Sequence, residues 1–223
     1  MMDVVLVRSY APPPVDRREI IRYMSARELT EELTALLEEC LREAEGHLRY
    51  AVCWREVPVS VTDTGVDLGF AAVESASLRK QLTGCGRAVL FGATVGLELD
   101  RLIARYSRLQ PVKALILQAI GAERVEALCD AFCADIRRQA QEKGEFTRSR
   151  FSPGYGDVPL ALQQDIFRVL DCARMIGLTL NGSLLMTPTK SVTAIIGIGD
   201  GSQQPDKEKC SACTKGDCVF RNL

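Results

Sequence analysis

Hydrophobic residues recur at helical spacing along residues 24–48, which read MSARELTEELTALLEECLREAEGHL. The apolar stripe consists of Leu29, Leu33, Leu36, Cys40, Leu41, Ala44 and Leu48. Residues three to four positions apart share one face of an α-helix, so the segment predicts an amphipathic helix. Ser25 and Glu28 have the spacing of a capping box, and we expect the helix to begin there.

The next segments predict β-structure around one short helix. Residues 50–68 are rich in Val and Thr and have turn residues at 63–65, a pattern that predicts two strands or a hairpin. A short helix is expected over residues 74–82. The run GRAVLFGATVG, residues 86–96, predicts a buried strand, and its glycines indicate the close approach of another backbone or of a ligand.

Residues 97–143 predict helix with a break at Gln110–Pro111, because proline fits the first turn of a helix and not its interior. The second half carries a buried stripe of Val125, Leu128, Cys129, Phe132 and Ile136. A helix over 160–172 and a strand over 190–199 follow. This order lacks a regular alternation of strands and helices, so we expect an α+β fold, with a twisted, mostly antiparallel sheet and several helices packed against it.

The end of the chain differs in composition from the rest. Residues 200–209 are polar and contain Gly and Pro without periodicity, which is typical of a linker. We therefore expect one domain over 1–199, a linker over 200–209 and a cysteine-containing tail over 210–223.

Composition excludes several classes of function. The chain has 223 residues, 26% charged residues and a net charge of -1, so it has no basic excess for binding nucleic acid. Its longest apolar run, residues 88–97, is shorter than the roughly 18 residues that a membrane span needs. The apolar run near the N-terminus, residues 4–7, is too short for a signal peptide. We expect a cytoplasmic protein with no nucleic-acid or membrane partner.

The cysteines are the residues of this chain that could bind a metal. Of nine cysteines, six lie singly or at helical spacing among apolar residues, where a thiol behaves as a small hydrophobe. Cys210, Cys213 and Cys218 instead form a CxxCx4C cluster. Three thiolates can hold a [4Fe-4S] cluster, or zinc if another residue completes the site. The alternative is a tail that binds no metal.

Residues 148–160, RSRFSPGYGDVPL, are too irregular for a helix or a strand. Arg150 offers a planar fork suited to a carboxylate, Pro153 and Gly154 expose backbone groups in a turn, and Tyr155 adds an amphipathic ring. Together they are suited to a small zwitterion with an aromatic part. The alternative is a surface turn in which Arg150 is paired with a nearby carboxylate.

Two ordered motifs carry a family resemblance. RFSPGYGDVPL resembles the RxxPGY stretch of the activation domain of vitamin B12-dependent methionine synthase, and LLMTPTKSVTAIIGIG resembles the second signature of that domain. VEALCDAFCADIRR is similar to the preceding helix, with Asp130 at an acidic ligand contact. Departures from the family pattern are Asp in place of Glu at 130, and Thr187 and Thr189 in place of Trp and Gly. The N-terminal half matches only in outline, as in standalone versions of the domain.

The resemblance implies a role in reactivating cobalamin. It implies binding of S-adenosylmethionine, with Arg150 at the carboxylate, residues Ser152, Pro153, Gly154 and Tyr155 near the adenosyl part, and Asp130 at a cationic or hydroxyl group. The implied partners are a corrinoid-carrying methyltransferase, whose cob(II)alamin is reductively methylated, and an electron donor such as flavodoxin or ferredoxin. The resemblance identifies no catalytic residue in this chain.

Cobalamin itself is expected on the partner. The family's corrinoid carriers ligate cobalt through a DxHxxG loop, and the single histidine here lies in EGHLRY. Two alternatives remain open: an iron–sulfur electron-transfer protein that serves a corrinoid methyltransferase, or a non-catalytic docking module for it.

Overall fold

A five-stranded sheet forms the centre of the computed structural model, which describes residues 4–26 and 29–201. Every neighbouring pair of strands is antiparallel. The order across the sheet is β1 (Leu6–Ser9), β2 (Ala51–Pro58), β6 (Cys85–Thr94), β10 (Ser191–Asp200) and β7 (Glu145–Thr147). The predicted α+β class with a mostly antiparallel sheet is therefore confirmed.

Strand β6 is buried on both faces, as its continuous apolar run predicts. Alternate residues of a strand point to opposite faces. Val89, Phe91 and Ala93 accordingly lie in one hydrophobic cluster, whereas Ala88 and Leu90 lie in the other. Other elements must therefore cover both faces of this sheet.

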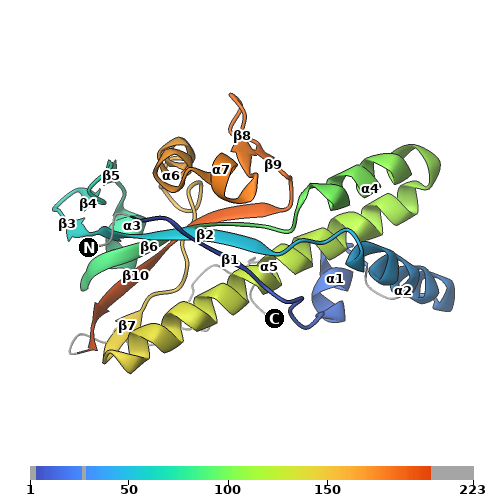
Figure 1. Cartoon of the computed structure of the whole chain (residues 1–223), viewed down its shortest axis with the longest axis horizontal. Helices are drawn as coiled ribbons and strands as arrows, with labels where there is room; N and C mark the ends of the chain where they lie inside the picture. The colour runs from blue at the N-terminus through green and yellow to red at the C-terminus, as the bar shows by residue number, and fades with distance from the viewer. Residues whose placement is uncertain (1–3, 27–28, 202–223) are drawn as a thin grey trace.

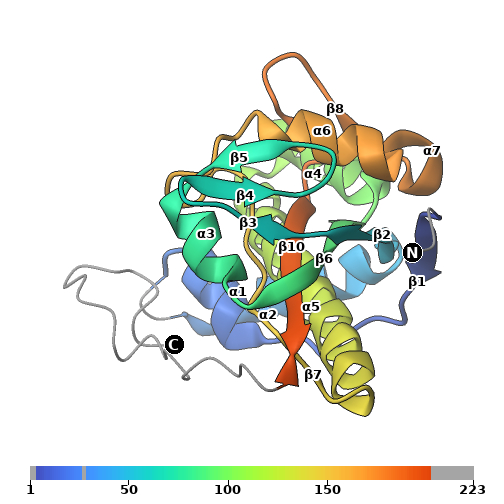
Figure 2. The ribbon, with the colours of Figure 1, turned by 90° about the vertical axis from the view of Figure 1, so that its left-hand side faces the viewer.

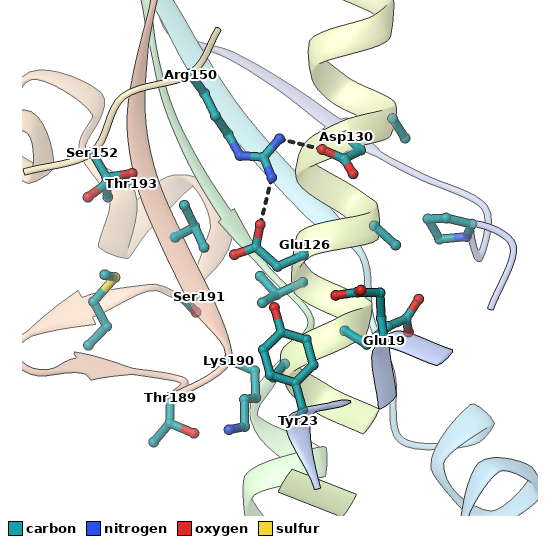
Figure 3. Close-up of a pocket in the computed structure, with 18 of the residues that line it drawn as sticks. Glu19, Tyr23, Glu126, Asp130, Arg150, Ser152, Thr189, Lys190, Ser191 and Thr193 are labelled. Atoms are coloured by element: carbon teal, nitrogen blue, oxygen red, sulfur yellow. Dashed lines mark hydrogen bonds and ion pairs between the residues drawn. The ribbon is translucent and has the colours of Figure 1, made fainter. Parts of the chain in front are cut away.

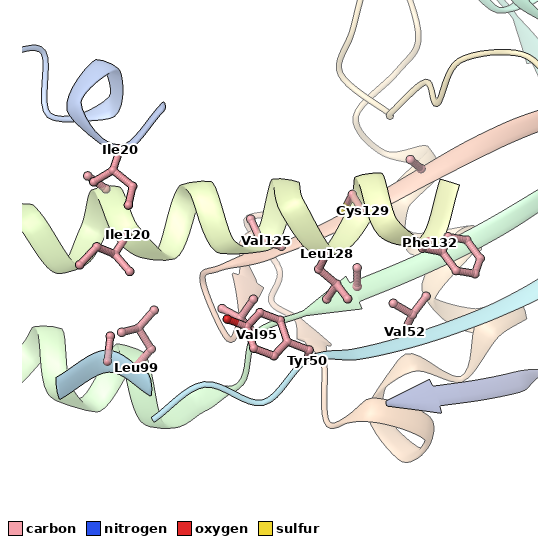
Figure 4. Close-up of a cluster of buried hydrophobic side chains, with 14 of the residues drawn as sticks. Ile20, Tyr50, Val52, Val95, Leu99, Ile120, Val125, Leu128, Cys129 and Phe132 are labelled. Atoms are coloured by element: carbon pink, nitrogen blue, oxygen red, sulfur yellow. The ribbon is translucent and has the colours of Figure 1, made fainter. Parts of the chain in front are cut away.

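The long helix α5 (Pro111–Glu142) forms the core of the first layer (Figure 1). Its 32 residues span about 48 Å at 1.5 Å per residue, so the helix extends beyond the sheet. Its N-terminal half packs against the other helices of this layer, and its C-terminal half lies on the sheet through Leu128 and Phe132 (Figure 4). The other helices are α1 (Arg17–Tyr23), α2 (Glu31–Glu45) and α4 (Leu97–Leu109).

Short elements cover the opposite face of the sheet (Figure 2). The helices here are α3 (Ala76–Leu82), α6 (Leu162–Leu170) and α7 (Cys172–Ile176). A three-stranded sheet and a two-stranded hairpin complete the layer: β3 (Ser60–Val61), β4 (Gly65–Asp67) and β5 (Ala72–Glu74), and β8 (Thr179–Leu180) with β9 (Met186–Thr187). No helix within the described ranges is long and apolar enough to cross a membrane.

The predicted start of the first long helix is wrong. Ser25 belongs to the turn that ends α1, where its φ is +55° and its N–H donates to the carbonyl of Arg22 at 2.9 Å. Thr30 caps α2 instead, and its hydroxyl accepts from the N–H of Leu33 at 3.2 Å. Helix α1 itself was not predicted, although Asp16 caps it by accepting from the N–H groups of Arg18 and Glu19.

A buried ion pair on α5 fixes the N-terminal arm. The side chains of Glu123 and Arg124 are 4% and 2% exposed and bond each other. Arg124 also donates to the carbonyls of Pro13 and Pro14 at 2.6 and 2.7 Å, while Glu123 accepts from the N–H of Asp16 at 3.0 Å. These bonds hold residues 13–16 against α5, and α1 begins directly after them.

We predict that Arg124→Met strongly destabilises the protein. The substitution leaves Glu123 as an uncompensated buried charge, so the free energy of unfolding should fall by about 3–5 kcal/mol. Urea denaturation followed by circular dichroism measures the loss. Arg101→Met is the control, because the Arg101–Glu98 pair is exposed and should contribute less than about 1 kcal/mol. Equal unfolding midpoints for the two variants would contradict the assigned role of Arg124.

Candidate functional site

A cavity of about 1100 Å³ lies between α5 and the first residues of β10 (Figure 3). Glu126 and Asp130 line it from α5, and residues 189–193 line it from the start of β10 and the two residues before it. Glu19 and Tyr23 of α1 close one end, and the segment that follows β7 closes the other. The two predicted family signatures thus meet at a single cavity.

The segment after β7 is anchored at both of its ends. Phe151 exchanges two backbone hydrogen bonds with Ile195 of β10, each 2.9 Å long. Asp157 accepts from the hydroxyl of Ser75 and from the N–H groups of Ala76 and Ser77, which begin α3. These hydrogen bonds, the one from Ser75 above all, hold the pKa of the Asp157 carboxyl well below its usual range. The loop between the anchors is therefore held in place before any ligand arrives.

Arg150 bridges two carboxylates of α5. Its Nη2 lies 2.6 Å from Glu126, and its Nη1 donates to Asp130 (Figure 3). Burial disfavours the charged guanidinium, but the hydrogen bond to Asp130 and the two negative charges outweigh burial, and the pKa of Arg150 is raised. Arg150 is thus a permanent cation facing two acids.

This cluster has a composition suited to an amino-acid group. Two carboxylates against one guanidinium leave a surplus negative charge that attracts an ammonium or sulfonium. Arg150 uses one hydrogen of each Nη in its ion pairs, and a guanidinium has five N–H donors, so donors remain for an incoming carboxylate. A zwitterion would find partners here for both of its charges.

All but one of the predicted ligand-binding residues line the cavity. Asp130, Arg150, Ser152, Pro153 and Tyr155 all line the cavity. Gly154 is not among the lining residues. Its φ of +88° supports the turn in which its N–H donates to the carbonyl of Val158 at 3.0 Å. Gly154 therefore shapes the loop, while its neighbours face the cavity.

Several residues that line the cavity were not identified from the sequence. Glu126 lies four residues before Asp130 and hence on the same face of α5, a spacing that would have identified it. Gln163 of α6 and Thr193 of β10 also line the cavity. Thr193 lies within the second signature but was not singled out, and no motif in the sequence marks Gln163. Lys190 is a further cation of the wall, and burial lowers its pKa, with the charge of Asp100 acting in the opposite direction.

The predicted metal site cannot be placed. Cys210, Cys213 and Cys218 lie outside the described residues. Within residues 4–26 and 29–201, no three His, Cys, Asp or Glu side chains group as metal ligands. Of the six other cysteines, five are buried and Cys133 is half-buried beside Arg150, with its Sγ 3.9 Å from Nη1. Burial raises the pKa of the Cys133 thiol, so this cysteine is held as a neutral thiol.

A match to a known protein family includes both signatures. The model of the family described as vitamin B12 dependent methionine synthase, activation domain, matches residues 83–210, more than half of the chain. Among solved structures, the fold is similar to the "MetH Reactivation Domain bound to AdoHcy" with a TM-score of 0.66 and 15% sequence identity, over 91% of this chain and 80% of that chain. At this identity the likeness shows the fold alone. No curated protein matches the sequence.

We predict that Asp157→Ala loosens the loop that carries the predicted site residues. Without the carboxylate, the N–H groups of Ala76 and Ser77 lose their acceptor, and hydrogen exchange at these two amides should accelerate. Exchange followed by NMR measures the change. Asp165→Ala is the control, because Asp165 pairs with an exposed arginine on α6. Unchanged exchange at residues 76 and 77 would show that Asp157 does not tie the loop to α3.

Proposed function

The chain belongs to the activation-domain family of vitamin B12-dependent methionine synthase, and from this premise we propose that it binds S-adenosylmethionine and supports reactivation of cobalamin on a separate methyltransferase. The family resemblance of the two sequence signatures is confirmed by the family match. The role of the individual residues is our proposal.

The observation that carries the proposal is the Arg150 cluster. S-adenosylmethionine combines a carboxylate with two cationic groups, an ammonium and a sulfonium. Glu126 and Asp130 supply two negative charges, and Arg150 supplies hydrogen-bond donors between them. We assign the carboxylate of the ligand to Arg150 and its ammonium to the α5 acids. Ser152, Pro153 and Tyr155 then lie along the adenosyl part.

The chemistry assigns this chain a binding and orienting role. One electron reduces the partner's cob(II)alamin, and the methyl group of S-adenosylmethionine is then transferred to it, which leaves S-adenosylhomocysteine. The cavity residues hold the ligand and orient its sulfonium. Consistent with this assignment, the solved reactivation domain of similar fold is described as bound to AdoHcy, the product that remains after methyl transfer.

The proposal requires two partners. Cobalamin must come from a corrinoid-carrying methyltransferase, because the single histidine of this chain does not lie in a cobalt-ligating DxHxxG loop. An electron donor such as flavodoxin or ferredoxin must supply the reduction. We place all three proteins in the cytoplasm.

Arg150→Met tests the proposal directly. The variant keeps most of the side-chain volume but removes the charge-assisted hydrogen bonds, which contribute about 1.5–3 kcal/mol. The dissociation constant of S-adenosylhomocysteine should therefore rise roughly 10- to 150-fold, measured by isothermal titration calorimetry. Arg137→Met, which replaces an exposed arginine of α5, is the control and should bind as the wild type does.

Two outcomes would reject the assignment. One is equal affinity of the wild type and Arg150→Met, which would make the segment after β7 only a structural turn. The other is the absence of binding by the wild type both alone and in complex with its methyltransferase. The complex is included because the corrinoid partner can complete the cavity.

The cysteine tail favours a second candidate function. The CxxCx4C spacing of Cys210, Cys213 and Cys218 is suited to a [4Fe-4S] cluster or zinc, and a cluster would make the chain an electron-transfer protein for the same methyltransferase. A docking module without ligand or metal is the remaining alternative.

We predict that Cys213→Ser removes most of the bound iron or zinc, because the remaining two thiolates cannot hold either metal tightly. Metal content after anaerobic reconstitution is measured by elemental analysis. Cys40→Ser serves as the control, since Cys40 lies buried in the core and far along the chain from the cluster. Equal metal content in the wild type and Cys213→Ser would contradict metal binding by the tail.

A further inference from the structure

The cavity has a second polar region, between β10 and α6. Thr193 is 1% exposed and Gln163 is 6% exposed, and both residues line the cavity. The Thr193 Oγ1 and the Gln163 Oε1 are buried and find no hydrogen-bond partner among the described residues. Figure 3 shows Thr193 and Ser152 on the side of the cavity away from α5.

Two buried polar atoms without hydrogen-bond partners lower the stability of the fold unless a bound ligand supplies the missing hydrogen bonds. A buried polar group without a hydrogen bond costs about 1–3 kcal/mol, and folded proteins contain only a few such groups. An apolar residue of similar size would avoid this cost at either position. The cost is consistent with side chains that are selected for binding and not for stability.

The backbone of β10 offers further hydrogen bonds at the same place. Ile195 exchanges both of its backbone hydrogen bonds with Phe151 on the β7 side of the strand. In an antiparallel sheet, the N–H and C=O groups of every second residue point to the same side of the strand. The N–H and C=O of Thr193 therefore point to the β7 side, as those of Ile195 do. Strand β7 pairs with residues 198–200 and Phe151 pairs with Ile195, so neither covers Thr193, which lines the cavity.

The donor and the acceptor of a glutamine amide are complementary to the hydrogen-bonding edge of adenine. Its oxygen accepts from the exocyclic amine while its nitrogen donates to a ring nitrogen, a pairing that is well established for Gln and Asn with adenine in the grooves of DNA. The Gln163 Oε1 has no hydrogen-bond partner among the described residues, so the acceptor half of this amide is not committed to another residue.

Resting on the function proposed above, we propose that Gln163 and Thr193 form the base-recognition part of the site. Gln163 Oε1 accepts from the exocyclic amine of adenine, Gln163 Nε2 donates to the adjacent ring nitrogen, and Thr193 Oγ1 bonds a second polar atom of the nucleoside. The Arg150 cluster and this pair then bind opposite ends of one ligand, and the segment from Arg150 to Pro153 runs between them.

Deleting the amine from the ligand tests the pairing. The probes are S-adenosylhomocysteine and its 6-deamino analogue, in which hydrogen replaces the exocyclic amine. The wild type should bind the deamino analogue about 5- to 150-fold more weakly, because Gln163 Oε1 is then left unpaired. Gln163→Met keeps the side-chain length without the amide, and it should bind the two compounds equally. Calorimetry measures all four affinities.

The adjacent glutamine provides a matched control. Gln164 is exposed on the same helix, and Gln164→Met should keep the preference of the wild type for the amine. If Gln163→Met does not fold, Gln163→Leu replaces it. A purely structural role for Gln163 would appear as a lower urea midpoint of the ligand-free variant, whereas our assignment expects a midpoint equal to or higher than that of the wild type.

The possible failures are distinguishable. If the wild type does not bind S-adenosylhomocysteine alone or with the methyltransferase, the proposed function itself is rejected. If the wild type binds and Arg150→Met weakens binding, but Gln163→Met keeps the full preference for the amine, only the base-recognition assignment is overturned.

Discussion

The buried Glu123–Arg124 ion pair is the interaction on which the cavity depends. Both residues lie on α5, yet their bonds reach Pro13, Pro14 and Asp16, more than 100 positions earlier in the chain. Asp16 in turn caps α1, whose Glu19 and Tyr23 close one end of the cavity. Charges this deeply buried tolerate little displacement, because each would lose partners that water cannot replace. The wall formed by α1 is therefore positioned by electrostatics as much as by apolar packing.

The Arg150 cluster differs from that pair in its exposure. The side chains of Arg150 and Asp130 are 26% and 70% exposed, so water reaches the cluster. A ligand can therefore replace these ion pairs at a modest cost in free energy. A ligand carboxylate can therefore approach Arg150 without opening the core. The fold thus holds its rigid charges behind the cavity wall and its exchangeable charges inside the cavity, a division suited to a preformed binding site.

Elements with a strong local pattern were predictable, and contacts between distant residues were not. The apolar run of β6, the stripe of α5 and the break at Pro111 follow from local chemistry, and they define the fold class. The choice of Thr30 over Ser25 as a cap depends on where α1 ends, which no periodicity reveals. Arg150 was predicted as a ligand-binding residue, but its pairing with Glu126 required the structure. Gln163 could not be identified, because a missing hydrogen bond leaves no trace in sequence.

The two polar regions of the cavity together restrict its ligand more than either does alone. In the proposed site, Gln163 and Thr193 bond the base, which S-adenosyl compounds share with adenine nucleotides. The acids of α5 distinguish these ligands at the other region. A triphosphate would bring several negative charges toward Glu126 and Asp130, and Arg150 is already paired with both acids. A sulfonium or ammonium meets attraction at the same point. In the proposed site, repulsion of phosphate by these acids acts together with the attractive contacts, and both favour an adenosyl group attached to an amino acid over one attached to phosphate.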